Sequence, residues 1–226
     1  MTVRARTSRR PLSSNRGLAA LWQHGDGLFR MAVQLALRPQ GSTTHDFRGY
    51  MGRIAQGAVR VGDRVLVAPG GGESTVTDIL TPAGPAQEAT VGQSVTLSLA
   101  DDIDAGRGFT LADAAHPPAT AREVTAALCW LDTAPQDPRA PYLMRIGTRT
   151  VAARVDVPES RLDIHTLERV AGGAPLQAND IGEVRIRLQD DIAFDPYGAC
   201  KAMGAFIIVD SRTNATVAAG MIDHRL

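Results

Sequence analysis

The chain of 226 residues is 44% hydrophobic and 21% charged, a composition typical of globular proteins and not of disordered or fibrous ones. Its 24 basic residues balance its 24 acidic residues, so the formal net charge of zero offers no long-range attraction to nucleic acid. Arginine, aspartate or glycine interrupts each apolar run well before the roughly 18 residues that a bilayer-spanning helix needs. We therefore expect neither a nucleic acid nor a membrane as its partner.

The first 27 residues differ in composition from the rest of the chain. Their arginines all precede the first acidic residue, Asp26, and lie among serine and threonine: Arg4, Arg6, Arg9, Arg10 and Arg16. An organelle transit peptide has a similar composition, but Pro11 and Gly17 would interrupt its amphipathic helix. We predict a disordered basic tail over residues 1–27 of a cytoplasmic protein, whose two cysteines are too few for a disulfide framework.

A period of two begins just after this tail. Met31, Val33, Leu35 and Leu37 alternate with smaller or polar residues, as a half-buried strand requires. Further short strand candidates follow, separated by turns that contain glycine or proline: residues 50–58, 64–68, 74–80 and 94–99. Strands at this spacing favour a closed barrel, so we predict a first β-barrel over residues 28–113.

The second half of the chain repeats this β pattern after a proline-bearing segment. Residues 114–121 contain two prolines and few large apolar side chains, which is typical of a linker between domains. Val124, Ala126, Leu128 and Trp130 then alternate with other residues along one strand. More strand candidates follow: residues 142–146, 149–157, 180–188, 205–210 and 216–221. We predict a second all-β barrel over residues 122–222, a short tail over 223–226, and little helix beyond a turn near 164–170.

Several motifs resemble those of known barrels. The run from Asp46 to Tyr50, followed by Gly52 to Gly57 and Val61 to Val65, resembles the second-domain barrel of translational GTPases. Further segments resemble more specifically the GTPase subunit of bacterial ATP sulfurylase, called sulfate adenylyltransferase subunit 1: residues 91–97, 102–108, 143–151, 192–197 and 213–222. The resemblance runs from Leu28 to Ile222 and implies two tandem translation-factor-like β-barrels, the second and third domains of that subunit, related to those of elongation factor Tu.

In that family an amino-terminal GTPase domain drives a separate catalytic subunit, which makes adenylyl sulfate from ATP and sulfate. The motifs of such a GTPase domain are missing here, because the Gly70–Gly72 cluster is followed by Glu73 and not by the lysine of a phosphate-binding loop. Asp46 to Gly49 matches a D-x-x-G switch motif only formally, since the family's barrel carries the same letters there. We predict no catalytic or nucleotide-binding residue and no cofactor, with GTP and Mg²⁺ needed only if a separate GTPase domain is present.

Other chemistry has little support in the sequence. The five histidines are far apart, with no spacing that suits zinc, and no G-x-S-x-G motif presents a nucleophile, so we predict no metal site. Arg145 and Arg149 are four residues apart and would share one face of a single strand. We name Asp46, Arg48, Arg145 and Arg149 as candidate partner contacts, with ordinary surface ion pairs as the alternative.

The resemblance implies a role in sulfate assimilation. On this hypothesis the chain is the non-catalytic barrel portion of a sulfate adenylyltransferase subunit 1-like protein, and it supports sulfate activation by docking to the catalytic subunit. Alone it would not be an enzyme. The alternative is a free-standing protein-interaction adaptor derived from translational GTPase barrels, and an enzyme with a new type of site comes third.

Overall fold

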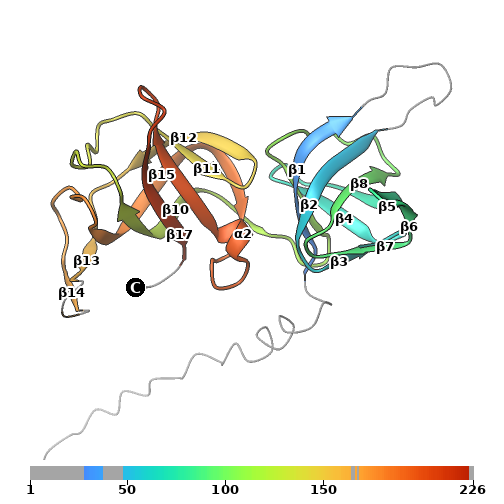
Figure 1. Ribbon diagram of the computed structural model, residues 1–226, viewed down its shortest axis with the longest axis horizontal. Coiled ribbons are helices and arrows are strands. Elements are labelled where there is room, and N and C mark those ends of the chain that lie inside the picture. The colour runs from blue at the N-terminus through green and yellow to red at the C-terminus, as the bar shows by residue number, and fades with distance from the viewer. Residues whose placement is uncertain (1–27, 38–47, 164–165, 167, 224–226) are drawn as a thin grey trace, which may run out of the picture.

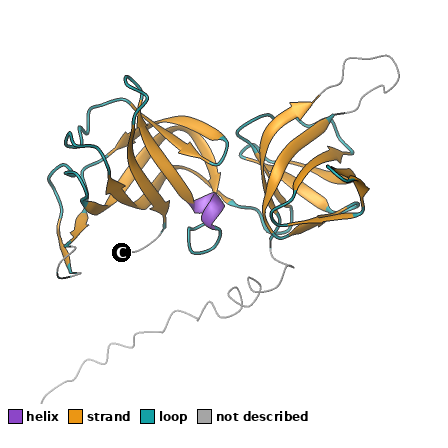
Figure 2. Cartoon of the chain, in the orientation of Figure 1, coloured by secondary structure: helices purple, strands orange, loops and turns teal. Residues whose placement is uncertain are grey.

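The computed structural model describes residues 28–37, 48–163, 166 and 168–223 and contains two β-barrels, drawn beside each other in Figure 1. The predicted tail over 1–27, residues 224–226 of the predicted second tail, and Asp46 therefore lie outside the described residues. Strands make up almost all of the regular structure, and the helix drawn in Figure 2 is the single turn α2 (Lys201–Gly204). The predicted all-β fold is confirmed, and the described residues include no GTPase domain. None of them forms a helix with the length and apolar character needed to cross a membrane.

Within the described residues, the first barrel is a sheet in the order β4-β9-β1-β2-β8-β5-β6. Since β4 also pairs with β5, six of these strands close into a ring and β6 extends it. A separate ribbon pairs β3 (Ala58–Arg60) with β7 (Glu88–Thr90). The strands of the sheet are β1 (Arg30–Leu37), β2 (Gly49–Gln56), β4 (Arg64–Ala68), β5 (Gly72–Thr81), β6 (Gly84–Ala86), β8 (Ser94–Leu99) and β9 (Thr110–Asp113).

The second barrel is a sheet in the order β10-β17-β16-β11-β12-β15-β13-β14. A pairing between β10 and β15 closes six of these strands into a ring, and β13 and β14 extend the sheet from β15. Strand β10 starts at Ala119, so pairing begins within the segment predicted as a linker. The strands are β10 (Ala119–Trp130), β11 (Tyr142–Ile146), β12 (Arg149–Val155), β13 (Ser160–Leu162), β14 (Arg169–Ala171), β15 (Ile181–Phe194), β16 (Ala205–Asp210) and β17 (Thr216–Ile222).

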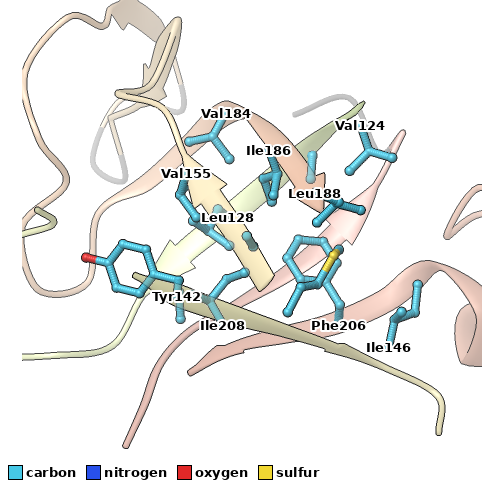
Figure 3. Packing of buried hydrophobic residues seen from close by; sticks show 14 of the residues in the cluster. Val124, Leu128, Tyr142, Ile146, Val155, Val184, Ile186, Leu188, Phe206 and Ile208 are labelled. Atoms are coloured by element: carbon cyan, nitrogen blue, oxygen red, sulfur yellow. The ribbon is translucent and has the colours of Figure 1, made fainter. Parts of the chain in front are cut away.

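Each barrel has its own apolar core. In the second barrel, Leu128, Ile186 and Ile208 are fully buried, and Figure 3 shows such side chains from different strands meeting in the interior. The alternation predicted for β10 is confirmed, because the core includes Val124, Ala126, Leu128 and Trp130. The burial of alternate residues on every side of a ring is the main driving force for closing such a barrel.

The alternation predicted for β1 is wrong in its second half. Met31 and Val33 are fully buried, but Leu35 is 50% and Leu37 37% exposed. The pairing of β1 with β2 shifts register between Val33 and Leu35, as in a β-bulge. One extra residue reverses which side chains face inward, so Ala36 packs against the core in place of the two leucines.

Strand β16 ends at Asp210, a carboxylate whose pKa is well below its usual value. The Arg212 guanidinium donates to Asp210, with Nη2 2.9 Å from Oδ2, and the Arg212 backbone N–H lies 2.7 Å from Oδ1. These bonds lower the pKa of Asp210 to about 2.

We expect this carboxylate to make the free energy of unfolding depend on pH in the acidic range. A lowered pKa in the folded state means that Asp210 stabilises the fold above the ordinary aspartate pKa near 3.9, and that this contribution is lost as the pH falls through about 2. Urea unfolding at pH 5 should show Asp210→Asn to be less stable than the unmodified chain, with the difference shrinking at pH 2. A difference that stays constant over this range would contradict the prediction.

Candidate functional site

Arg48, the first candidate contact, lies in an ion-pair cluster of the first barrel. Its guanidinium contacts Asp102 and places Nη2 3.2 Å from Asp104 Oδ1, and it stands 5.7 Å from the centre of the Tyr50 ring. Partial burial lowers the pKa of Arg48, but the hydrogen bonds to the two aspartates outweigh this and the net shift is upward. Arg48 therefore holds the acidic loop around Ile103, whose carbonyl accepts a 2.5 Å hydrogen bond from Tyr50 Oη.

Arg145 and Arg149 do not share a strand, so the prediction of a common face is wrong. Strand β11 ends at Ile146 and β12 begins at Arg149, with Gly147 in the left-handed region at φ 53°. The register pairs Ile146 with Arg149 and Arg145 with Thr150. Residues opposite each other in a hairpin face the same side, so Arg149 lies on the side of the buried Ile146 and Arg145 faces outward.

Arg149 instead contacts the other barrel. Its guanidinium carbon lies 5.9 Å from the centre of the Phe109 ring, within the range of a cation–π contact. Beside it, the backbone N–H of Gly108 donates to Thr148 Oγ1 at 3.2 Å. The turn between β11 and β12 thus packs on the loop that precedes β9, and Figure 1 shows this end of the second barrel facing the first.

A buried ion pair completes the junction between the barrels. Arg30, on β1 and only 1% exposed, forms a bidentate pair with Asp195, which directly follows β15. The Nε–Oδ2 distance is 2.7 Å and the Nη2–Oδ1 distance 3.1 Å, while Nη1 donates to the carbonyl of Phe29 at 3.0 Å. The two residues are 165 positions apart in the sequence and belong to different barrels. Their bidentate ion pair therefore fixes one barrel against the other.

The outer face of the second barrel carries an apolar row. Cys129, Ala219 and Ile207 are register partners across β10, β17 and β16. The row continues to Ile181 on β15 at one end and to Arg145 on β11 at the other. The four apolar members are all partly exposed and Arg145 is exposed, whereas the chain neighbours of Cys129, Ile207 and Arg145 belong to the core.

This row lines a depression of about 690 Å³, which we call the β17 groove. Its small side chains, Cys129 and Ala219, leave room between larger neighbours, and among the residues that the structure describes Arg145 is the only charged one that lines it. Gly147 and Tyr197 also line the groove, so it reaches the end of the barrel that faces β1. A cavity of this size accommodates a few side chains of a partner.

The two cysteines occupy different environments. Cys129 is partly exposed in the β17 groove, while Cys200 is buried next to α2, and neither forms a disulfide. Burial raises the pKa of the Cys200 thiol. In the described part of the chain, no group of three or more histidine, cysteine, aspartate or glutamate side chains is arranged to hold a metal ion. Neither the groove nor the junction was predicted from the sequence, and the groove is a surface that a partner could contact.

Comparison with known folds defines the class of protein. Residues 123–223 match the family model described as GTP-eEF1A C-terminal domain-like. The crystal structure of sup35 complexed with GDP superposes with a TM-score of 0.77 at 20% identity, covering 89% of this chain and 48% of that one. The sup35 complex with GMPPNP gives a TM-score of 0.73, also at 20% identity, covering 87% and 47%. The chain is a tandem pair of translation-factor-type β-barrels.

Curated relatives identify the family. The chain is 43% identical to the bifunctional enzyme NodQ of Rhizobium tropici over 88% of its length, and 39% identical to sulfate adenylyltransferase subunit 1 of Aeromonas salmonicida over 85%. It is also 39% identical to the bifunctional enzyme CysN/CysC of Mycobacterium tuberculosis over 85%. The chain spans 30%, 40% and 32% of these relatives. The resemblance to sulfate adenylyltransferase subunit 1 that the motifs predicted is therefore confirmed over most of the chain.

Proposed function

We propose that this chain serves as the non-catalytic barrel portion of a sulfate adenylyltransferase subunit 1-like protein, and that it supports adenylyl sulfate formation by docking to the catalytic subunit. The observation that carries this proposal is the 39% identity to a sulfate adenylyltransferase subunit 1 over 85% of the chain. The proposal places the chain in the cytoplasm, where its two free cysteines would stay reduced.

The glycine cluster supports a binding role over a nucleotide-hydrolysing one. Gly70 and Gly71 have φ of 124° and 81° and form the tight turn between β4 and β5. Glu73, just beyond this turn, is paired with Arg64 across the hairpin. A phosphate-binding loop needs a lysine and a helix amino terminus after its glycines, and here a strand and a carboxylate take their place.

The junction also favours a binding role. The Arg30–Asp195 pair and the Arg149–Phe109 contact hold two barrels in one arrangement. A preorganised surface loses little conformational entropy on association, so more of the contact energy is available for affinity. A two-barrel body of this kind is suited to hold a partner protein in a defined position.

Calorimetric titration against the catalytic subunit of the same organism's sulfate adenylyltransferase tests the proposal. We expect saturable heat and co-migration on gel filtration at concentrations in the range of tens of micromolar or below. If neither heat nor co-migration is detected at such concentrations, docking is excluded and the adaptor hypothesis is favoured. As a control, the purified chain incubated with GTP and Mg²⁺ should release no phosphate above the buffer rate, and measurable turnover would contradict a non-catalytic role.

A further inference from the structure

We propose that the β17 groove is the site at which the catalytic subunit docks, and that the docking segment presents apolar side chains next to a carboxylate. This inference rests on the docking function proposed above and adds the surface and the chemistry of the contact. It concerns one face of the second barrel, formed by β10, β17, β16 and the adjoining end of β11.

The first step is the apolar character of this face. The outward residues of a small closed barrel normally meet water and are polar, since the inward residues already fill the core. Here the outward row across four strands consists of Ile181, Cys129, Ala219 and Ile207, all partly exposed. Met221, one position along the outer side of β17, extends the same surface and lines the groove. An apolar depression of this kind is suited to receive apolar side chains of a partner.

The second step is the contrast with the rest of the same barrel. Beyond Ile181, several outward residues of β15 are charged and paired within the chain, as in Arg187 with Asp156 and Arg185 with Glu159. Arg122 and Asp191 form another such pair, with Nε 3.3 Å from Oδ1. These strands satisfy their charges internally and present a surface that water solvates well. The same barrel therefore has a solvated side and an apolar side.

The third step is the charge at the end of the row. Arg145 lies opposite Ile207 in the register and is exposed, and its guanidinium has no ion-pair partner among the described residues. A guanidinium beside an apolar depression is complementary to a carboxylate that flanks an apolar side chain. This charge selects a protein segment of that composition over a purely aliphatic or a basic one.

The fourth step is the position of the groove relative to the first barrel. Gly147 lines the groove, and a Cβ at that position would lie 3.7 Å from the Ala32 side chain of β1. A stable protein interface buries about 800 Å² on each partner, more than the groove alone supplies. A segment seated in the groove would thus be the centre of an interface that extends across the junction onto the first barrel.

Variants on the two sides of the barrel test this inference. Ala219→Arg places a bulky charge in the centre of the row, and Ala152→Arg places the same residue at an exposed position on β12, outside the groove. By titration against the catalytic subunit, we expect Ala219→Arg to weaken binding about 100-fold and Ala152→Arg less than about twofold. Arg145→Glu should weaken binding about tenfold by opposing a carboxylate.

The native cysteines supply a second measurement that needs no substitution. A maleimide should label the partly exposed Cys129 and spare the buried Cys200, and mass spectrometry separates the two peptides. Saturating catalytic subunit should slow the labelling of Cys129 at least about tenfold, because a docked segment covers the groove. This measurement remains decisive if Ala219→Arg fails to fold.

The outcomes separate the two proposals. In the first outcome the unmodified chain binds the catalytic subunit, Ala219→Arg and Arg145→Glu bind it equally tightly, and Cys129 stays reactive in the complex. The groove is then not the docking site, and the proposed function stands. Absence of binding by the unmodified chain overturns both. Loss of binding by the groove variants, together with protection of Cys129, supports the inference.

Discussion

Replacing Asp195 by alanine is expected to lower the free energy of unfolding by about 3–5 kcal/mol. The substitution removes the carboxylate but leaves the Arg30 guanidinium, which is 1% exposed and receives both of its ionic contacts from Asp195. A buried guanidinium without a carboxylate partner has lost its hydration, and no counter-charge compensates for that loss. Because the pair joins β1 to the end of β15, its loss also removes the main polar link between the barrels.

Guanidinium chloride unfolding followed by circular dichroism measures this effect. We expect one transition for the unmodified chain and, for Asp195→Ala, an earlier transition that separates into two as each barrel unfolds independently. Asp191→Ala is the matched control, because Asp191 forms a surface ion pair with Arg122 and its loss should cost at most about 1 kcal/mol. Equal effects of the two variants would show that the buried pair does not hold the barrels together.

Replacing Trp130 by alanine is expected to destabilise the second barrel by about 3–5 kcal/mol. The side chain is 2% exposed and packs edge-to-face on Tyr142, with ring centres 6.0 Å apart. Its indole N–H also donates to the carbonyl of Ala134 at 2.8 Å. Alanine would leave a cavity between β10 and β11 and one carbonyl without its donor, and each effect lowers stability.

Far-ultraviolet circular dichroism is the suitable probe, since the substitution removes one of the two tryptophans and would change the fluorescence signal itself. Trp130→Phe serves as the control, because it keeps most of the apolar volume and loses only the hydrogen bond and part of the ring, so a smaller loss is expected. In Trp130→Ala the first barrel should keep the stability it has in the unmodified chain. An unfolding midpoint within error of the unmodified chain would contradict the role of Trp130 in the core.

The sequence predicted those parts of the fold that depend on local periodicity. The strand candidates at 64–68, 94–99, 142–146 and 205–210 match β4, β8, β11 and β16, because alternation and turn residues are properties of neighbouring positions. Strand β9 was not predicted, since four residues without alternation give no such signal. The bulge in β1 could not be predicted either, because it is defined by the pairing with β2 and not by the residues of β1 alone.

The features that could recognise a partner were beyond prediction for the same reason. Arg30 and Asp195 are ordinary charged residues in the sequence, and only the packing of the two barrels brings them together. The groove combines residues from β10, β16 and β17 whose relation depends on register. Arg145 was named as a candidate contact and lines that groove, but the reason given for it, a shared face with Arg149, was wrong because a two-residue turn separates them.

The order in which the strands close each barrel has a consequence for synthesis on the ribosome. In each ring the last closing strand inserts between two earlier ones: β9 between β4 and β1, and β17 between β10 and β16. Until that strand has left the exit tunnel, the nascent chain exposes two unpaired edges, which are prone to pair with other chains. Premature termination before Thr216 would therefore leave the second barrel open and the product a target for chaperones, even though more than nine-tenths of the chain had been made.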